Sequence, residues 1–416
     1  MRPSTLWEVL FVENRLLIGE GEKKMTKKEK WLFTSESVSE GHPDKVCDQI
    51  ADAILDECLA GDPTSHVACE VFATIEYILI GGEITSKSHV DYEKVAREVL
   101  RKIGYTKPEL GIGCDTCFID VKIKEQSPDI AMGVNRGDIL KMGAGDQGIM
   151  FGYATNESEG YMPLPVTIAH KLVRTATSLR KAGQFPGARP DMKSQVTIDY
   201  TNPKHPRIDK MLISCQHEPD VNLDDFKKFI HEQIMIPVAK SFNLNDDFEY
   251  LINPTGRFVI GGPMGDTGLT GRKLIVDTYG GTARHGGGSF SGKDPSKVDR
   301  SASYYARYMA KNLVAAGAAD RLEVQLSYAI GVAEPMSIGI STFGTKHYSD
   351  EIILEAIDKF FDARPGAIIS QFKLTTPNFK YADTTNYGAF GRPDLDLPWE
   401  HLDKVDELKK FFASHK

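Results

Sequence analysis

Two neighbouring stretches of the chain decide its fold class. Residues 41–60, GHPDKVCDQIADAILDECLA, place apolar side chains at helical spacing, at Val46, Ile50, Ile54 and Cys58. Pro43 suits the first turn of such a helix, because the N–H that proline lacks would have no partner there. Residues 67–80, VACEVFATIEYILI, are rich in β-branched and aromatic residues and lead into Gly81-Gly82. This pattern predicts one strand followed by a turn.

The same alternation continues along the chain. Helices are predicted over residues 91–103, 165–182 and 223–239, and a helix of small residues over 301–316. Strand-like patterns occupy residues 195–200, 274–279 and 324–330. Because strands and helices are mixed without one unbroken β-α-β series, the pattern predicts an α/β (α+β) protein. The length of 416 residues favours two or three domains of roughly 100 to 200 residues each.

Two glycine-rich segments resemble each other. Gly145-Asp146-Gln147-Gly148 and Gly265-Asp266-Thr267-Gly268 are 266 − 146 = 120 residues apart. One short echo is weak evidence of a repeat, and two chance turns explain it about as well. A chain of about three such units would still fit the length.

Composition narrows the class of protein. Hydrophobic content of 41% and charged content of 26% are ordinary for a globular protein. The net charge of −8 argues against nucleic acid as a partner. Glu70 and Glu76 interrupt the longest apolar run before it reaches the ~20 residues that a membrane span requires. No membrane segment and no membrane partner are therefore expected. The six sparse cysteines favour a reducing compartment, the cytoplasm. Cys114-x-x-Cys117 has no second pair for a zinc site, and two small residues at a strand edge are the favoured interpretation.

Residues 257–300 are the most unusual segment. They hold seven Lys or Arg and four Asp, and eleven of the 44 positions are Gly. Such a segment can offer backbone N–H groups and cations to a phosphate ligand, although a surface loop with solvated charges is the alternative. From Gly287 its sequence matches the P-loop pattern G-x-x-x-x-G-K, but Asp294 stands where the P-loop has a Ser or Thr that binds magnesium. The segment therefore favours phosphate binding of another design.

The start of the first predicted helix is a second candidate site. A helix N-terminus favours anions, and His42 with Asp44 places an imidazole beside a hard carboxylate. An acidic residue that only stabilises the helix end is an equally good interpretation of Asp44 taken alone.

Longer motifs carry a family resemblance. Residues 37–45 (SVSEGHPDK), 143–148 (GAGDQG) and 280–294 (GGTARHGGGSFSGKD) resemble the S-adenosylmethionine synthetase (methionine adenosyltransferase) family. The resemblance runs in order from about Trp31 to Trp399. It includes the further motifs Gly82–Thr85, Gln126–Ile130, Arg189–Gln195 and Gly265–Gly268.

The resemblance implies a fold and an assembly. It implies three similar domains with pseudo-threefold symmetry, each a mixed β-sheet with helices on one face. The expected boundaries are an N-terminal extension at 1–30 that need not be folded, domains at 31–136, 142–260 and 261–401, and a tail at 402–416. A homodimer with shared active sites is expected, with dimers pairing into a homotetramer.

The resemblance also implies a reaction. ATP and L-methionine would give S-adenosylmethionine, and the tripolyphosphate left behind would be hydrolysed to phosphate and diphosphate, with two Mg²⁺ per site and K⁺ as cofactors. A thioether sulfur has no proton to lose, so its attack needs no general base. The difficulty lies in stabilising the leaving group, which agrees with a cluster of cations. The alternatives are an inactive nucleotide-binding regulatory homologue and, weakened by Asp294, a P-loop kinase.

The resemblance also implies the site residues, which are taken from the positions of this chain that match the motifs of the family. The catalytic set would be His42, Asp146, Lys193, Arg272 and Lys293. The methionine site would use Glu83, Gln126, Asp266 and Lys297. ATP contacts would be His42, Asp191, Lys193, Arg257, Phe258, Asp266, Arg272, Lys273, Ser289 and Lys293. Mg²⁺ would be bound by Asp44 and Asp299, and K⁺ by Glu70. Residues 126–136 would form a mobile loop that closes over the site.

Overall fold

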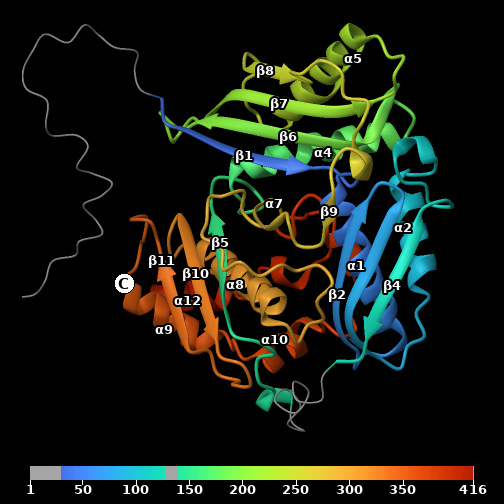
Figure 1. Cartoon of the computed structure of the whole chain (residues 1–416). Coiled ribbons are helices and arrows are strands. Elements are labelled where there is room, and N and C mark those ends of the chain that lie inside the picture. The colour runs from blue at the N-terminus through green and yellow to red at the C-terminus, as the bar shows by residue number, and fades with distance from the viewer. Residues whose placement is uncertain (1–29, 127–138, 416) are drawn as a thin grey trace, which may run out of the picture.

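Strands and helices alternate along the chain, as the sequence patterns predict. The computed structural model describes residues 30–126 and 139–415 (Figure 1). Its strands are β1 (Leu32–Val38), β2 (His66–Thr74), β3 (Tyr77–Thr85), β4 (Phe118–Lys124), β5 (Gly148–Thr155), β6 (Ala188–Asp199), β7 (Arg207–His217), β8 (Glu249–Ile252), β9 (Gly268–Leu269), β10 (Arg321–Tyr328) and β11 (Ser337–Ser341). Its α-helices are α1 (Pro43–Gly61), α2 (Tyr92–Ile103), α4 (Leu164–Lys181), α5 (Leu223–Phe229), α6 (Ile236–Ser241), α7 (Leu274–Asp277), α8 (Val298–Ala315), α9 (Asp350–Phe360), α10 (Pro365–Phe372), α11 (Tyr381–Thr384) and α12 (Val405–Ala413).

Within the described ranges the strands form three sheets. Each sheet includes one strand from a distant part of the chain, called here its borrowed strand. The orders are β1-β6-β7-β8, β9-β2-β3-β4 and β5-β10-β11. Each borrowed strand, β1, β9 or β5, pairs antiparallel with the strand that follows a long helix. The chain therefore repeats one unit three times: a strand, a long helix and an antiparallel strand pair. The first strand of each unit joins the sheet of the next unit, and β9 of the last returns to the first (Figure 1).

The two glycine-rich echoes lie at equivalent places in this repeat. Gly148 is the first residue of β5, and Gly268 is the first residue of β9. Both segments therefore lead into a strand that is borrowed by a neighbouring sheet. The short sequence echo reflects a structural repeat and not two chance turns.

One long helix packs against each sheet. Helix α1 packs on β2, α4 packs on β1 and β6, and α8 packs on β5 and β10. In α1 the predicted apolar positions Val46, Ile50, Ile54 and Cys58 are all fully buried. The sheet β1-β6-β7-β8 has an apolar core of its own, whereas the other two sheets share one continuous core. The first and third units are therefore joined by side-chain packing as well as by β9.

Helix α8 packs closely on β5 because Gly152 of β5 has no side chain. A Cβ atom added to Gly152 in β5 would lie 2.0 Å from the backbone carbonyl of Ala306 in α8. We expect Gly152→Ala to lower the free energy of unfolding by about 1 to 3 kcal/mol, because the helix must move away from the sheet. Urea unfolding measures the change.

Gly339→Ala is the matched control for this substitution, since Gly339 lies in β11 of the same sheet. The nearest atom to an added Cβ there is 3.5 Å away, which is an ordinary contact. Its effect is expected to stay within about 0.5 kcal/mol. Equal losses in the two variants would contradict the close-packing explanation.

The strand predicted over residues 67–80 is in fact two strands. Chain reversal occurs at Ile75 and Glu76, between β2 and β3, and Glu76 adopts a left-handed backbone with φ of 47°. Gly81 and Gly82, predicted as the turn, instead lie inside β3. The carboxylate of Glu76 accepts hydrogen bonds from the Gly113 N–H and the Thr116 hydroxyl, each at 3.0 Å. Such distant partners stabilise a turn that has no glycine or proline of its own.

The strand predicted over residues 274–279 is wrong. Residues 274–277 form the short helix α7, whose last residue, Asp277, contacts the buried Lys45. The Asp277 N–H bonds back to the Lys273 carbonyl at 2.9 Å. A buried ion pair and a local turn outweigh the β-propensity of Ile275 and Val276.

The predicted helices over 91–103, 165–182, 223–239 and 301–316 are confirmed, the third with a π-helical turn at Ile230–Met235. The strands predicted over 195–200 and 324–330 are confirmed as parts of β6 and β10. All six cysteines are buried and free. None of the helices in residues 30–126 and 139–415 has the length and apolar character needed to cross a bilayer.

Candidate active site

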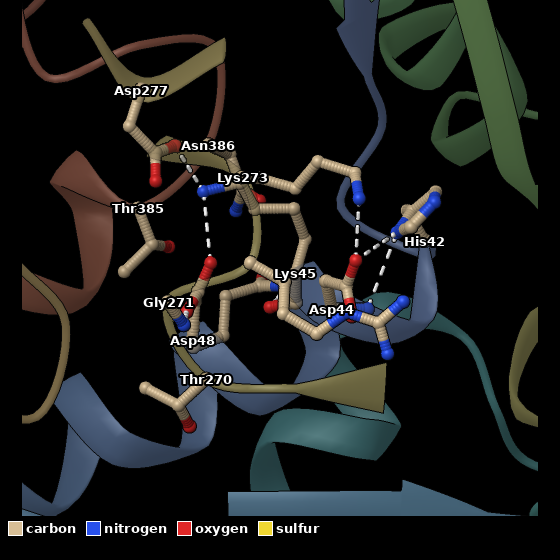
Figure 2. Close-up of polar contacts among 12 residues, drawn as sticks. His42, Asp44, Lys45, Asp48, Thr270, Gly271, Lys273, Asp277, Thr385 and Asn386 are labelled. Carbon is tan, nitrogen blue, oxygen red and sulfur yellow. Dashed lines mark hydrogen bonds and ion pairs between the residues drawn. The ribbon is translucent and has the colours of Figure 1, made fainter. Parts of the chain in front are cut away.

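The first group of candidate residues gathers at the N-terminus of α1 (Figure 2). His42 is the N-cap residue, and its Nδ1 accepts a hydrogen bond from the Asp44 N–H at 3.2 Å. The Asp44 carboxylate accepts from the Leu269 N–H at 3.0 Å and from Lys273 Nζ at 2.5 Å. Arg272 Nε lies 3.5 Å from the same carboxylate. One imidazole, one carboxylate and two cations therefore meet at a helix end that itself favours anions.

The imidazole of His42 is neutral. Burial, followed by the charges of Lys273 and Lys193, lowers the pKa of His42 to about 3. Because Nδ1 accepts a hydrogen bond, the ring proton of this neutral form resides on Nε2. Burial would raise the pKa of Asp44, but its hydrogen bonds to Lys273 and Leu269 outweigh burial and lower it. The group therefore offers an N–H donor beside a charged carboxylate.

Asp191 in β6 is buried and partly unpaired. Its Oδ2 accepts the Gly262 N–H at 2.8 Å, whereas Oδ1 has no hydrogen-bond partner among the described residues. Burial raises the pKa of Asp191 to about 6. An unpaired buried acceptor of this kind suits the hydroxyl groups of a ligand, as the resemblance to the synthetase family implies for ATP.

The raised pKa of Asp191 predicts a pH dependence of stability. The folded pKa of about 6 exceeds the ordinary value of 3.8, so this carboxyl group favours folding below pH 3.8 and loses that contribution as pH rises through 6. Asp191→Asn removes the titration. The unfolding free energy of the variant, relative to the wild type, is therefore expected to rise by about 2 kcal/mol between pH 4 and pH 7.

Urea unfolding at several pH values measures this difference. Asp220→Asn, at an exposed position before α5, serves as the control for the substitution itself and is expected to be as stable as the wild type at pH 7. Parallel pH curves for Asp191→Asn and the wild type would contradict the prediction.

The second group of candidate residues lines one cavity of about 560 Å³. Lys293 Nζ pairs with Asp299 at 2.6 Å inside it, and Lys297 Nζ pairs with Asp294 at 2.5 Å beside it. Burial raises the pKa of Glu70, so a cation beside this carboxylate would stabilise its charged form. The candidate residues in the lining are Glu70, Glu83, Gln126, Asp146, Lys293, Lys297 and Asp299.

The glycine-rich loop over residues 286–294 is no P-loop, because it follows α7 and no strand leads into it. Asp294 is 2% exposed and accepts the Val67 N–H at 2.6 Å and the Ser296 N–H at 2.8 Å. Burial would raise the pKa of Asp294, but its ion pair with Lys297 outweighs burial and lowers it. Asp294 therefore attaches the loop to the start of β2 and orients Lys297.

The two groups lie at different points along one strand. The segment of Lys293 bridges to Ala68 of β2, whereas Leu269, which bonds to Asp44, pairs with Phe72 of β2. Four residues of strand correspond to about 13 Å. Within one chain, the residues expected at a single substrate site thus form two separate groups.

The remaining candidates have varied surroundings. Asp266 and Lys193 are exposed, and both charges act on the pKa of Asp191. Phe258 follows β8, and its N–H donates to His217 Nε2 at 3.0 Å; Arg257 beside it is exposed. The Ser289 side chain lies 2.6 Å from where a Cβ on Gly271 would be, next to Arg272. The expected loop lies, beyond Gln126, outside the described residues.

The expected Mg²⁺ ligands fit that ion only in part. In the described part of the chain, no three His, Cys, Asp or Glu side chains meet as a metal cage. Asp44 and Asp299 each offer one carboxylate, and each now pairs with a lysine. Mg²⁺ is commonly bound by one or two carboxylates together with substrate phosphates, so this donor set fits Mg²⁺ that arrives with a polyphosphate.

Sequence reasoning missed a set of buried charged residues behind both groups. Lys45 is fully buried and contacts Asp48 at 3.0 Å and also Asp277 (Figure 2). Asp52 forms a two-point ion pair with Arg300, at 2.7 and 2.5 Å. A signal was available, because Asp recurs at 44, 48, 52 and 56, on one face of the predicted helix.

Comparisons with known proteins show the family to which the chain belongs. Three family models match: "S-adenosylmethionine synthetase, N-terminal domain" over residues 30–128, "central domain" over 141–258 and "C-terminal domain" over 260–401. The S-adenosylmethionine synthase of Mesoplasma florum is 61% identical over 379 residues, 91% of this chain and 99% of the relative. That of Mycoplasma mycoides is 62% identical over 383 residues, 92% and 98% of the two chains. That of Clostridium botulinum is 56% identical over 391 residues, 92% and 100%. With all three domains matched in order and relatives this similar over nearly their whole length, the chain belongs to the S-adenosylmethionine synthetase family.

Proposed function

We propose that the protein is a methionine adenosyltransferase that joins ATP and L-methionine. With one water consumed, the products are S-adenosylmethionine, phosphate and diphosphate. The observation that carries this proposal is the neutral, buried His42 at a helix N-terminus, with Asp44, Arg272 and Lys273 around it. Family membership with relatives named S-adenosylmethionine synthase supports the same reaction.

The chemistry follows from these groups. A lone pair of the methionine sulfur attacks C5′ of ATP, the C5′–O bond breaks, and its electron pair leaves on the tripolyphosphate oxygen. The sulfur becomes a sulfonium without losing a proton, so no base is needed. Nε2–H of His42 can donate a hydrogen bond to the departing oxygen, and Arg272, Lys273 and Lys293 stabilise the developing charge. Water then cleaves the tripolyphosphate before the products leave.

The residue roles are proposed as follows. His42, Lys193, Arg272 and Lys293 stabilise the leaving group, with Asp146 at the edge of the cavity. Glu83, Gln126, Asp266 and Lys297 bind methionine. Asp191, Arg257, Phe258, Lys273 and Ser289 complete the ATP site. Asp44 and Asp299 would hold two Mg²⁺ and Glu70 one K⁺, and these ions supply further positive charge to the polyphosphate when bound.

A direct assay tests the reaction. The purified full chain is incubated with ATP, L-methionine, MgCl₂ and KCl, and S-adenosylmethionine is quantified by chromatography. Product is expected only when both substrates are present, and much less after Mg²⁺ is chelated. Tight ATP binding without product would favour an inactive nucleotide-binding regulatory homologue instead.

We further propose a homodimer with shared active sites, with dimers pairing into a tetramer, in the cytoplasm. The separation of the two groups along β2 supports shared sites, since a partner could bring its Lys293 group to this chain's His42 group. The free, buried cysteines are consistent with a reducing compartment.

Mixed dimers test the sharing of sites. Lys273→Ala and Lys293→Ala chains are each expected to be nearly inactive alone. Co-expressed, they would form dimers in which one site carries both substitutions and the other carries neither. Such dimers, isolated with two affinity tags, are expected to recover about half of the wild-type kcat. Dimers of wild type with the Lys273→Ala/Lys293→Ala double variant are the control, and are expected to have two singly altered, inactive sites.

A different outcome would contradict shared sites. If each chain held its own complete site, the mixed dimers of single variants would be inactive. The control dimers would then keep half of the activity, because their wild-type chain would be intact.

A further inference from the structure

Helix α1 carries four aspartates at four-residue spacing, Asp44, Asp48, Asp52 and Asp56. Residues four apart lie on one face of a helix, about 6 Å from one rung to the next. Each of these carboxylates accepts one or two backbone N–H groups from residues between 269 and 382, far from α1 in the sequence. The donors are Leu269, Gly271, Gly292, and the pair Tyr381 and Ala382.

Asp48 holds the segment that carries Arg272 and Lys273. Its Oδ1 accepts the Gly271 N–H at 2.9 Å, and its Oδ2 pairs with Lys45 at 3.0 Å. On the other side, the same segment is hydrogen-bonded to β2, where the Thr270 N–H donates to the Val71 carbonyl at 3.0 Å. The Val71 N–H donates to the Thr270 hydroxyl oxygen at 2.8 Å. The backbone on the N-terminal side of Arg272 is therefore held from two directions.

Asp52 holds the segment that carries Lys293. Its Oδ1 accepts the Gly292 N–H at 2.8 Å and also an N–H of Arg300 at 2.7 Å. The same guanidinium nitrogen donates to the Lys293 carbonyl at 3.0 Å. From β2, the Cys69 N–H donates to the Gly292 carbonyl at 2.9 Å. Gly292 has φ of 80°, and an added Cβ would lie 1.9 Å from the Cys69 carbonyl oxygen, so this peptide has no room to move.

We propose that Asp48 and Asp52 are positioning residues, which fix the backbone of the two cation-bearing segments against α1 and so place Arg272, Lys273 and Lys293 at the leaving group. Both carboxylates are fully buried, so neither can touch substrate itself. Hydrogen bonds from backbone N–H groups to buried carboxylates are strong, and a misplacement of about 1 Å costs on the order of 10²-fold in rate. This inference rests on the proposed function.

The same helix offers a matched control. Asp56 occupies the next rung and accepts the Tyr381 N–H at 2.8 Å and the Ala382 N–H at 3.0 Å. These residues begin α11, which carries none of the candidate ligands. Asp48→Ala, Asp52→Ala and Asp56→Ala therefore remove the same group from one helix face, and only the first two free a cation-bearing segment.

Steady-state kinetics of S-adenosylmethionine formation by the full chain test the proposal, well below the thermal midpoint of each variant. We expect kcat to fall about 10²-fold in Asp48→Ala and Asp52→Ala. The KM for methionine is expected to change by less than about threefold, since a charge on the leaving group matters most in the transition state. Asp56→Ala is expected to keep wild-type kcat. Asp48→Asn is expected to recover most of the kcat, because its amide oxygen can still accept the Gly271 N–H.

The following outcomes would contradict the proposal. Wild-type kcat in Asp48→Ala, or an equal loss of kcat in Asp56→Ala, would overturn it while leaving the proposed function intact. No product from the wild-type protein would overturn the proposed function and this inference together. Should Asp52→Ala fail to fold, the Asp48 variants and Asp52→Asn, which retains an acceptor for Gly292, give the decision.

Discussion

Lys293→Ala is expected to lower kcat by about 10²- to 10³-fold. Lys293 lies in the cavity that collects the candidate residues of the second group, and its ammonium pairs with Asp299 at 2.6 Å. Its backbone is held by Arg300, which donates to the Lys293 carbonyl, and by the bridge to Ala68, while Asp52 accepts the N–H of the neighbouring Gly292. The charge is thus preorganised for a polyphosphate that gains negative charge as the C5′–O bond breaks. Because the ion pair is partly exposed, its loss should change the unfolding free energy by only about 1 kcal/mol.

Steady-state kinetics and thermal unfolding, measured on the same preparation, separate the two effects. Lys346→Ala is the control, since it also removes a lysine from an ion pair, with Asp350 at 3.1 Å, in this case exposed and outside the candidate site. It is expected to retain wild-type kcat. Instability of Lys293→Ala large enough to explain its lost activity would contradict a role in charge stabilisation.

Lys45→Met is expected to lower the free energy of unfolding by about 3 to 5 kcal/mol. Lys45 is fully buried and contacts two carboxylates, Asp48 and Asp277. Burial would lower the pKa of Lys45, but these carboxylates outweigh burial and raise it, so the ammonium is charged. Methionine fills a similar volume without the charge. Both carboxylates would then remain buried without their cation.

Urea unfolding of the single and double variants tests the explanation. Lys45→Met/Asp277→Asn removes one of the unpaired charges and is expected to be more stable than Lys45→Met alone. Lys94→Met serves as the control, because Lys94 is exposed in α2 and lies 4.0 Å from Glu98. Its effect is expected to stay within about 1 kcal/mol. A loss below that size in Lys45→Met would argue against the buried ion pair as a main contribution.

Local patterns in the sequence predicted the helices better than the sheets. In α1, the apolar spacing alone indicated the helix, because the face that carries it packs on β2. The borrowing of β1, β5 and β9 could not be predicted, since it depends on pairing between residues more than 100 positions apart, such as Leu32 with Asp199. The helix α7 was missed for a similar reason, because its conformation depends on the contact of Asp277 with Lys45, 232 residues away.

The site residues were predicted from motifs and resemblance, and the structure adds the charges behind them. Asp294 looked like a defect in a P-loop, whereas its contacts with Val67, Ser296 and Lys297 are structural. Asp48 and Asp52 escaped notice because charged residues in a helix are usually solvated. Their burial follows from the packing of the segments around Gly271 and Gly292, which no local pattern in α1 reveals.

One measurement tests the central claim most directly: the balance of all products from ATP. The purified full chain is given ATP with and without L-methionine, in the presence of Mg²⁺ and K⁺, and every phosphate species is quantified. We predict one phosphate and one diphosphate for each S-adenosylmethionine formed, with neither ADP nor AMP accumulating and no release without methionine. Release of ADP, or of AMP with diphosphate, without S-adenosylmethionine would contradict attack of the sulfur on C5′ with the whole tripolyphosphate as leaving group.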